Sequence, residues 1–151
     1  MTAGYLLDTN VLSILAPQSS PTGMERSDGA AFRAWVREHD ERLFLSVITL
    51  AEIQAGVSRL ERRGATKRAA DLSQWLRAIL ELYQSRTLAL ASDAALEAGR
   101  MLDRAAATGA APGFEDAAIA ATAFVHDLTV VTANVRHFKL FGVRFVSPPI
   151  G

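Results

Sequence analysis

Five short apolar runs alternate with longer stretches of helical spacing, and this alternation is the feature that most limits the fold. The apolar runs are too short for helices and are predicted as strands at residues 5–7, 43–46, 88–91, 129–132 and 144–146. Helices are predicted at residues 10–15, 30–39, 46–63, 65–83, 92–107 and 114–126. Strands that alternate with helices form a parallel sheet with right-handed crossovers, so we expect an α/β fold with helices on both faces of the sheet.

The composition of the chain and its lack of linkers indicate one domain that spans residues 1–151. The chain has no internal repeat, low-complexity tract or linker, and 50% of its residues are hydrophobic while 21% are charged. Residues 18–29 are rich in Ser, Pro, Gly and charge and are predicted as a mobile loop, either a binding flap or a surface insertion. Gly64 is predicted to end the helix that precedes it.

Charge and cysteine content narrow the classes of function. Sixteen acidic and sixteen basic side chains cancel, so any contact with nucleic acid must come from a local basic patch. The absence of cysteine removes disulfides, thiolate metal sites and cysteine nucleophiles. Neither a signal peptide nor a run long enough to cross a bilayer is evident, so we expect a cytoplasmic protein with no membrane partner.

The first candidate functional residue is Asp8, which ends the apolar run of residues 4–7 and is followed by Thr9 and Asn10. In an open α/β sheet the carboxyl ends of the strands face the ligand crevice, so Asp8 is predicted to point at whatever is bound there. The structural alternative is that Asp8 caps the helix that starts near Asn10.

Two further acids, Glu52 and Asp116, are predicted in the first turns of helices that start near the same crevice. Neither has a lysine or arginine three or four residues away, whereas several other helical acids do. Each also has a structural alternative. Thr49 and Glu52 match a capping box, and Glu115 with Asp116 complements the positive end of a helix.

Taken together, the three acids predict a metal site. Half-buried carboxylates without a cation rise in pKa and lose their charge unless something positive lies between them. A divalent cation has that effect. Hard oxygen ligands without a His or Cys cluster favour Mg²⁺ or Mn²⁺ over zinc, and one or two ions are expected.

Four segments resemble a known family in their order and spacing: LLDTNV, SVITLAEIQAG, EDAAIAATA and TVVTANVRHF. Over essentially the whole chain they are similar to the PIN domain of VapC-type toxins, including the FitB-like members. The resemblance implies a three-layer α/β/α sandwich with a five-stranded parallel sheet and metal-dependent endoribonuclease activity. It also implies a homodimer, inhibited by a small DNA-binding antitoxin whose tail occupies the active-site groove.

The resemblance also implies a set of site residues. By position these are the acids Asp8, Glu52 and Asp116, with Thr9, Asn10 and Thr132 as polar support. Asn134 takes the place of a fourth acid that the family often has, and His137 lies where another acid is sometimes seen. An amide oxygen carries no charge, so a second ion would be held more weakly. The hypothesis is that Asp8 and Asp116 hold the main ion, while Glu52 and Asn134 position a second ion or the attacking water.

Basic residues supply candidate RNA contacts. Those close to the site are Arg136, His137 and Lys139, and a second cluster contains Arg59, Arg62, Arg63, Lys67 and Arg68. Such clusters track phosphates without reading sequence. The cluster of residues 59–68 is equally explained as a solvated face, whereas the other is favoured by its proximity to the site. His137 is a general-base candidate or simply a surface loop residue. Trp35 and Trp75 are predicted as core or partner contacts. The helix pair 51–83 suits either an antitoxin helix or core packing.

Three other classes of protein compete with the nuclease hypothesis. A signalling receiver domain would need an early pair of acids and a lysine at the end of the fifth strand, where this chain has Ser147 and two prolines. A haloacid-dehalogenase-like phosphatase would need an acid at Asn10. A non-catalytic binding module that keeps the PIN fold stays open, because Asn134 replaces an acid.

Overall fold

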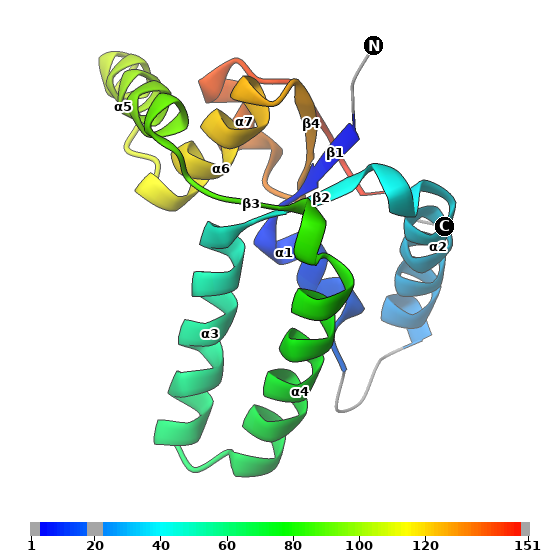
Figure 1. The fold of residues 1–151 in the computed structure, drawn as a ribbon. Helices are drawn as coiled ribbons and strands as arrows, with labels where there is room; N and C mark the ends of the chain where they lie inside the picture. The colour runs from blue at the N-terminus through cyan, green and yellow to red at the C-terminus, as the bar shows by residue number, and fades with distance from the viewer. Residues whose placement is uncertain (1–3, 18–22, 149–151) are drawn as a thin grey trace.

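A parallel sheet forms the centre of the computed structural model, which describes residues 4–17 and 23–148. Its strands are β1 (Gly4–Leu7), β2 (Leu43–Ser46), β3 (Thr87–Leu88), β4 (Leu128–Val131) and β5 (Phe145–Val146). They pair in the order β3-β2-β1-β4-β5, and every pairing is parallel (Figure 1). The strand β1 therefore lies in the middle, with its carboxyl end between those of β2 and β4.

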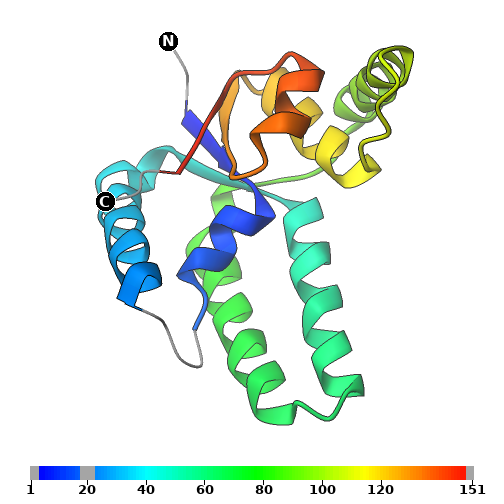
Figure 2. The ribbon, with the colours of Figure 1, turned by 180° about the vertical axis from the view of Figure 1, so that it is seen from behind.

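Helices cover both faces of this sheet. They are α1 (Thr9–Leu12), α2 (Gly23–His39), α3 (Val47–Arg62), α4 (Thr66–Leu82), α5 (Ser92–Ala107), α6 (Phe114–Val125) and α7 (Val135–Phe141), with three short 3-10 helices, η1 (Ser13–Leu15), η2 (Asp40–Arg42) and η3 (Gln84–Arg86). Figure 2 shows α5, α6 and α7 gathered on one side and α1 to α4 on the other. None of the helices in the described part of the chain is long and apolar enough to span a membrane.

The side chains of the central strands alternate between the two faces of the sheet, and each face has its own hydrophobic core. Leu6 and Val130 belong to the cluster formed with α5, α6 and α7, whereas Leu7 and Val131 belong to the cluster formed with the helices opposite. Successive side chains of a strand point to opposite faces, so one buried strand serves both layers. The predicted three-layer α/β/α sandwich is confirmed.

The alanine-rich helix α6 is buried on nearly all sides, as its sequence predicts. Every residue from Ala117 to Ala123 is buried, and α6 packs against both the sheet and α5. Small side chains allow this close approach from two directions.

Several predicted boundaries are wrong. The third strand was expected at 88–91 but covers only Thr87–Leu88, because Ala91 already precedes the first turn of α5 and β3 is a short edge strand. Helix α2 begins at Gly23, so part of the predicted loop 18–29 is helical, while residues 18–22 lie outside the described residues. The predicted helix 10–15 divides into α1 and η1, and α7 was not predicted at all.

Helices α3 and α4 form an arm that projects from the sheet. They pack side by side, and Figures 1 and 2 show the pair extending away from the rest of the fold. Gly64, at a φ of 83°, forms the turn between them, which confirms its predicted role as a helix stop. The arm begins beside the carboxyl end of β1 and ends far from the sheet.

The close approach of β1 to β2 yields a stability prediction. A Cβ at Gly4 would lie 2.5 Å from the carbonyl oxygen of Arg42, so Gly4→Ala must push the strands apart. We expect a loss of about 1–3 kcal/mol in the free energy of unfolding, measured by urea denaturation. Gly99 is the control, since a Cβ there meets nothing within 4 Å and alanine favours the helix by about 0.5–1 kcal/mol. Equal effects of the two substitutions would contradict the packing argument.

Candidate functional site

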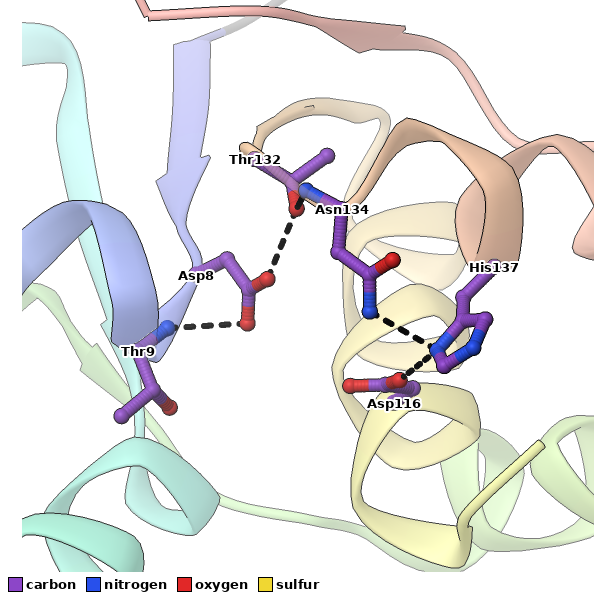
Figure 3. Close-up of polar contacts among 6 residues, drawn as sticks. All are labelled: Asp8, Thr9, Asp116, Thr132, Asn134 and His137. Atoms are coloured by element: carbon purple, nitrogen blue, oxygen red, sulfur yellow. Dashed lines mark hydrogen bonds and ion pairs between the residues drawn. The ribbon is translucent and has the colours of Figure 1, made fainter.

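The parallel register of β1 and β4 places Asp8 beside Thr132. Leu7 pairs with Val131, and the next residue of each strand is Asp8 and Thr132 respectively. The Thr132 hydroxyl donates to Asp8 Oδ2 at 2.8 Å, and the backbone N–H of Thr9 donates to Asp8 Oδ1 at 2.8 Å (Figure 3). Asp8 is thus both the N-cap of α1 and a carboxylate at the carboxyl edge of the sheet.

The surroundings of the buried Asp8 carboxylate disfavour its charged form. Only 4% of the residue is exposed. Burial raises its pKa above the ordinary value of 3.8, the hydrogen bonds from Thr132 and Thr9 lower the pKa, and the charges of Asp116 and Glu52 raise it again. The three predicted acids therefore lie close enough for Asp8 to experience the other two charges.

Glu52 faces the same region from α3. Its carboxylate accepts a 2.6 Å hydrogen bond from the Thr9 hydroxyl, whose oxygen is also 3.1 Å from the hydroxyl of Thr49. The N-cap of α3 is Ser46, which accepts from the N–H of Ile48 at 3.0 Å. The capping-box interpretation of Glu52 is therefore wrong, because Thr49 lies inside the helix and is buried.

Asp116 enters from the first turn of α6 and is held by His137. Its Oδ2 lies 2.6 Å from Nδ1 of His137, and the side-chain amide nitrogen of Asn134 lies 2.8 Å from the same ring nitrogen (Figure 3). A protonated Nδ1 donates to Asp116, whereas an unprotonated Nδ1 accepts from Asn134, so the tautomer selects the partner. Sequence reasoning placed His137 among RNA contacts, and its contact with Asp116, 21 residues away, has no local signal.

The supporting residues predicted from sequence also gather here. The backbone N–H of Asn134 donates to the Thr132 hydroxyl oxygen at 2.9 Å, and the N–H of Ala133 donates to Asn10 Oδ1 at 3.4 Å. The bond from Ala133 to Asn10 holds the segment after β4 against the start of α1, while the bond from Asn134 to Thr132 lies within that segment. Arg136 and Lys139, the other predicted RNA contacts, are exposed on α7, the helix that carries His137.

The three acids are free of lysine and arginine partners within residues 4–17 and 23–148. In the same described residues no group of three His, Asp or Glu side chains is arranged to hold a metal ion. Each carboxylate is instead hydrogen-bonded to a side chain of its own surroundings: Thr132, Thr9 or His137. The chemistry of the donors nevertheless suits a hard divalent cation, because all three are carboxylates and the charges of Asp116 and Glu52 raise the pKa of the buried Asp8.

A cavity of about 400 Å³ opens beside Glu52, between α1–η1 and the α3–α4 arm. Its wall includes Thr9, Ser13, Glu52, Gly56, Arg68 and Trp75. Trp75, predicted as a core or partner contact, packs against the core cluster that contains Leu7 and Val131 and also lines this cavity. Sequence reasoning did not identify the cavity, since its walls come from segments far apart in the chain.

Comparison with known proteins agrees with this fold. The PIN domain family model matches residues 5–142. The plasmid stability protein StbB of Pseudomonas syringae pv. tomato is 31% identical over 145 residues, and VapC ribonuclease Y4jK of Sinorhizobium fredii is 30% identical over 145 residues, each covering 95% of this chain and 96% of the relative. The crystal structure of FitAcB from Neisseria gonorrhoeae superposes with a TM-score of 0.77 at 33% identity, covering 95% of this chain and 97% of the other.

The fold and the family match together define a PIN domain. The chain belongs to the PIN domain family, as its motifs predicted. The receiver-like and phosphatase-like alternatives lose their basis, because neither is a PIN fold.

The raised pKa of Asp8 leads to a prediction about stability. The folded state binds the Asp8 proton more tightly than the unfolded state, so stability is lost as pH rises from below 3.8 through the folded pKa. Asp8→Asn avoids this loss and should be the more stable protein at pH 7 in chelator, with the advantage shrinking below pH 3.8. Denaturant titrations at several pH values measure the difference.

A surface acid provides the control for this titration. Asp71 is half-exposed on α4 and paired with Lys67 at 3.3 Å, so Asp71→Asn should give no gain in stability at pH 7. If Asp8→Asn is less stable than the wild type by the same amount at every pH, the hydrogen bonds of the Asp8 carboxylate contribute more to stability than burial of its charge costs.

Proposed function

We propose that the protein is a divalent-metal-dependent endoribonuclease, the toxin of a type II toxin–antitoxin pair. The observation that carries the proposal is the placement of Asp8, Glu52 and Asp116, which come from three separate segments to one edge of the sheet. Asp8 experiences the charges of both other acids, and none of the three is neutralised by lysine or arginine within the described residues. Such a set is suited to Mg²⁺ or Mn²⁺.

Each residue has a distinct role in this proposal. Asp8 and Asp116 would hold the main ion, while Glu52 and Asn134 would hold a second ion or orient the attacking water. A bound ion supplies charge neutralisation for the scissile phosphate and activation of water. Thr132 and Thr9 fix the orientation of the Asp8 carboxylate, and His137 fixes that of Asp116.

The substrate and partners follow from the relatives. The relative named VapC ribonuclease supports RNA as the substrate. The resemblance to VapC-type toxins supports a small DNA-binding antitoxin as the cognate inhibitor, a homodimer and a cytoplasmic location. The rival function is a non-catalytic PIN-fold binding module. Asn134 in place of an acid favours it, as does the lack of a preassembled metal group in the described residues.

Cleavage of a mixed RNA pool by the purified, partner-free protein tests the proposal. We expect cleavage with Mg²⁺ or Mn²⁺ and none with chelator. Asp8→Asn and Asp116→Asn should each lower the rate by about 100-fold or more, because each removes several kcal/mol of charge stabilisation. Mn²⁺ should also raise the melting temperature of the wild type more than that of either variant, which reports binding independently of activity.

Asp71→Asn serves as the control and should retain both the cleavage rate and the Mn²⁺ shift, since the half-exposed Asp71 on α4 is paired with Lys67. Cleavage that survives chelator and both site substitutions would assign the activity to a contaminant or to another site. RNA binding without cleavage in any metal would support the binding-module alternative.

A further inference from the structure

We propose that an RNA strand bound at the three acids continues along one face of α3 toward the tip of the α3–α4 arm, where Arg59 and Arg63 bind its phosphates. This inference rests on the proposed function and names the path of its substrate. Nothing in the family match or in the named relatives assigns a role to these two arginines.

Helical spacing aligns the path. Glu52, Gly56 and Arg59 follow one another at intervals of four and three residues, which places them in one stripe along α3. Arg63, the C-cap of α3, comes four residues later and extends the stripe to the end of the helix. Glu52 and Gly56 line the cavity beside the acids, so the stripe opens onto that cavity. The line from the proposed metal ligands to the tip is therefore continuous.

The far end of the stripe is positively charged and unpaired. Arg59 and Arg63 are exposed and form no ion pair with any residue that the structure describes. Glu61, the nearest acid in sequence, lies on the opposite side of the helix by its spacing from Arg59. Arg68 adds a third cation in the wall of the cavity, where its guanidinium contacts the carbonyl of Pro17. In a chain of zero net charge this is a local basic surface.

The middle of the stripe leaves room for a ligand. A Cβ at Gly56 would meet no atom within 4 Å, so the helix surface there is open. From Glu52 to Arg63 the helix rises about 16 Å, the length of roughly four or five nucleotides of a stacked strand. A trinucleotide held at the acids would not reach the arginines, whereas a longer strand would.

Charge complementarity identifies the occupant. Unpaired guanidinium groups favour a polyanion, and the stripe begins at the acids proposed to act on a phosphodiester. RNA meets both conditions. An acidic protein segment would meet only the first.

The double variant Arg59→Gln/Arg63→Gln tests the path. Binding of fluorescent single-stranded RNA of 3 and 12 nucleotides is measured by anisotropy in Mg²⁺, before any cleavage is detectable on a gel. For the 12-mer we expect roughly tenfold weaker binding and a salt slope smaller by about 1.4, the value for two single-strand phosphate contacts. Affinity for the 3-mer should not change.

Two further variants separate this path from general effects. Arg37→Gln/Arg77→Gln removes the same charge from exposed positions outside the stripe and should leave the 12-mer affinity unchanged. Gly56→Leu introduces a good helix former and leaves all charges in place but fills the open surface, so it should weaken 12-mer binding without reducing the salt slope.

Equal 12-mer affinities for the two arginine pairs would overturn the path, as would an effect on binding of the antitoxin but not of RNA. If metal-dependent cleavage persists in either case, only this inference fails. If the wild type cleaves no RNA of the mixed pool in any metal, the proposed function fails as well.

Discussion

The hydrogen bond from Thr132 to Asp8 joins the two central strands at their carboxyl ends, and the rest of the site is built around it. It spans 124 residues of sequence, yet it follows directly from the pairing of Leu7 with Val131. A carboxylate this deeply buried loses hydration, and Thr132 and Thr9 restore only part of that loss. The fold thus keeps an ionisable group where an apolar side chain would be more stable. Proteins retain such groups mainly for function.

The other acids reach the same place through the ends of neighbouring elements. Ser46 ends β2 and caps α3, so Glu52 lies in the second turn of a helix that starts beside β1. Asp116 arrives on α6, which approaches the sheet closely because its buried face is almost entirely alanine. In both cases the order of the strands and the residue at which the helix begins determine where the acid lies. The site is therefore a consequence of the topology, and its side chains add only the final orientation.

Elements with a local sequence pattern could be predicted, whereas elements and contacts that depend on distant parts of the chain could not. The strands β1, β2 and β4 are buried on both faces and read as apolar runs, so they and the acids that follow them are predictable. The edge strand β3 is too short to leave such a pattern. Helix α7 depends on Phe138 and Phe141, which are buried in a tertiary core that no local pattern reveals. The contacts of Glu52 with Thr9 and of Asp116 with His137 likewise depend on chain segments brought together only by folding.

Asn134 shows how a departure from the family pattern changes the electrostatics of the site. Three ionised acids carry a charge of −3, and a single divalent cation would leave −1, whereas a fourth acid would leave −2. The smaller residual charge favours one firmly held ion over two. Asn134 is also within hydrogen-bonding distance of Nδ1 of His137, the ring nitrogen that lies 2.6 Å from Asp116 Oδ2, so this amide contact can affect Asp116 only through the tautomer of the ring. A lysine or arginine at either position would neutralise Asp116 and remove the reason for a metal to bind.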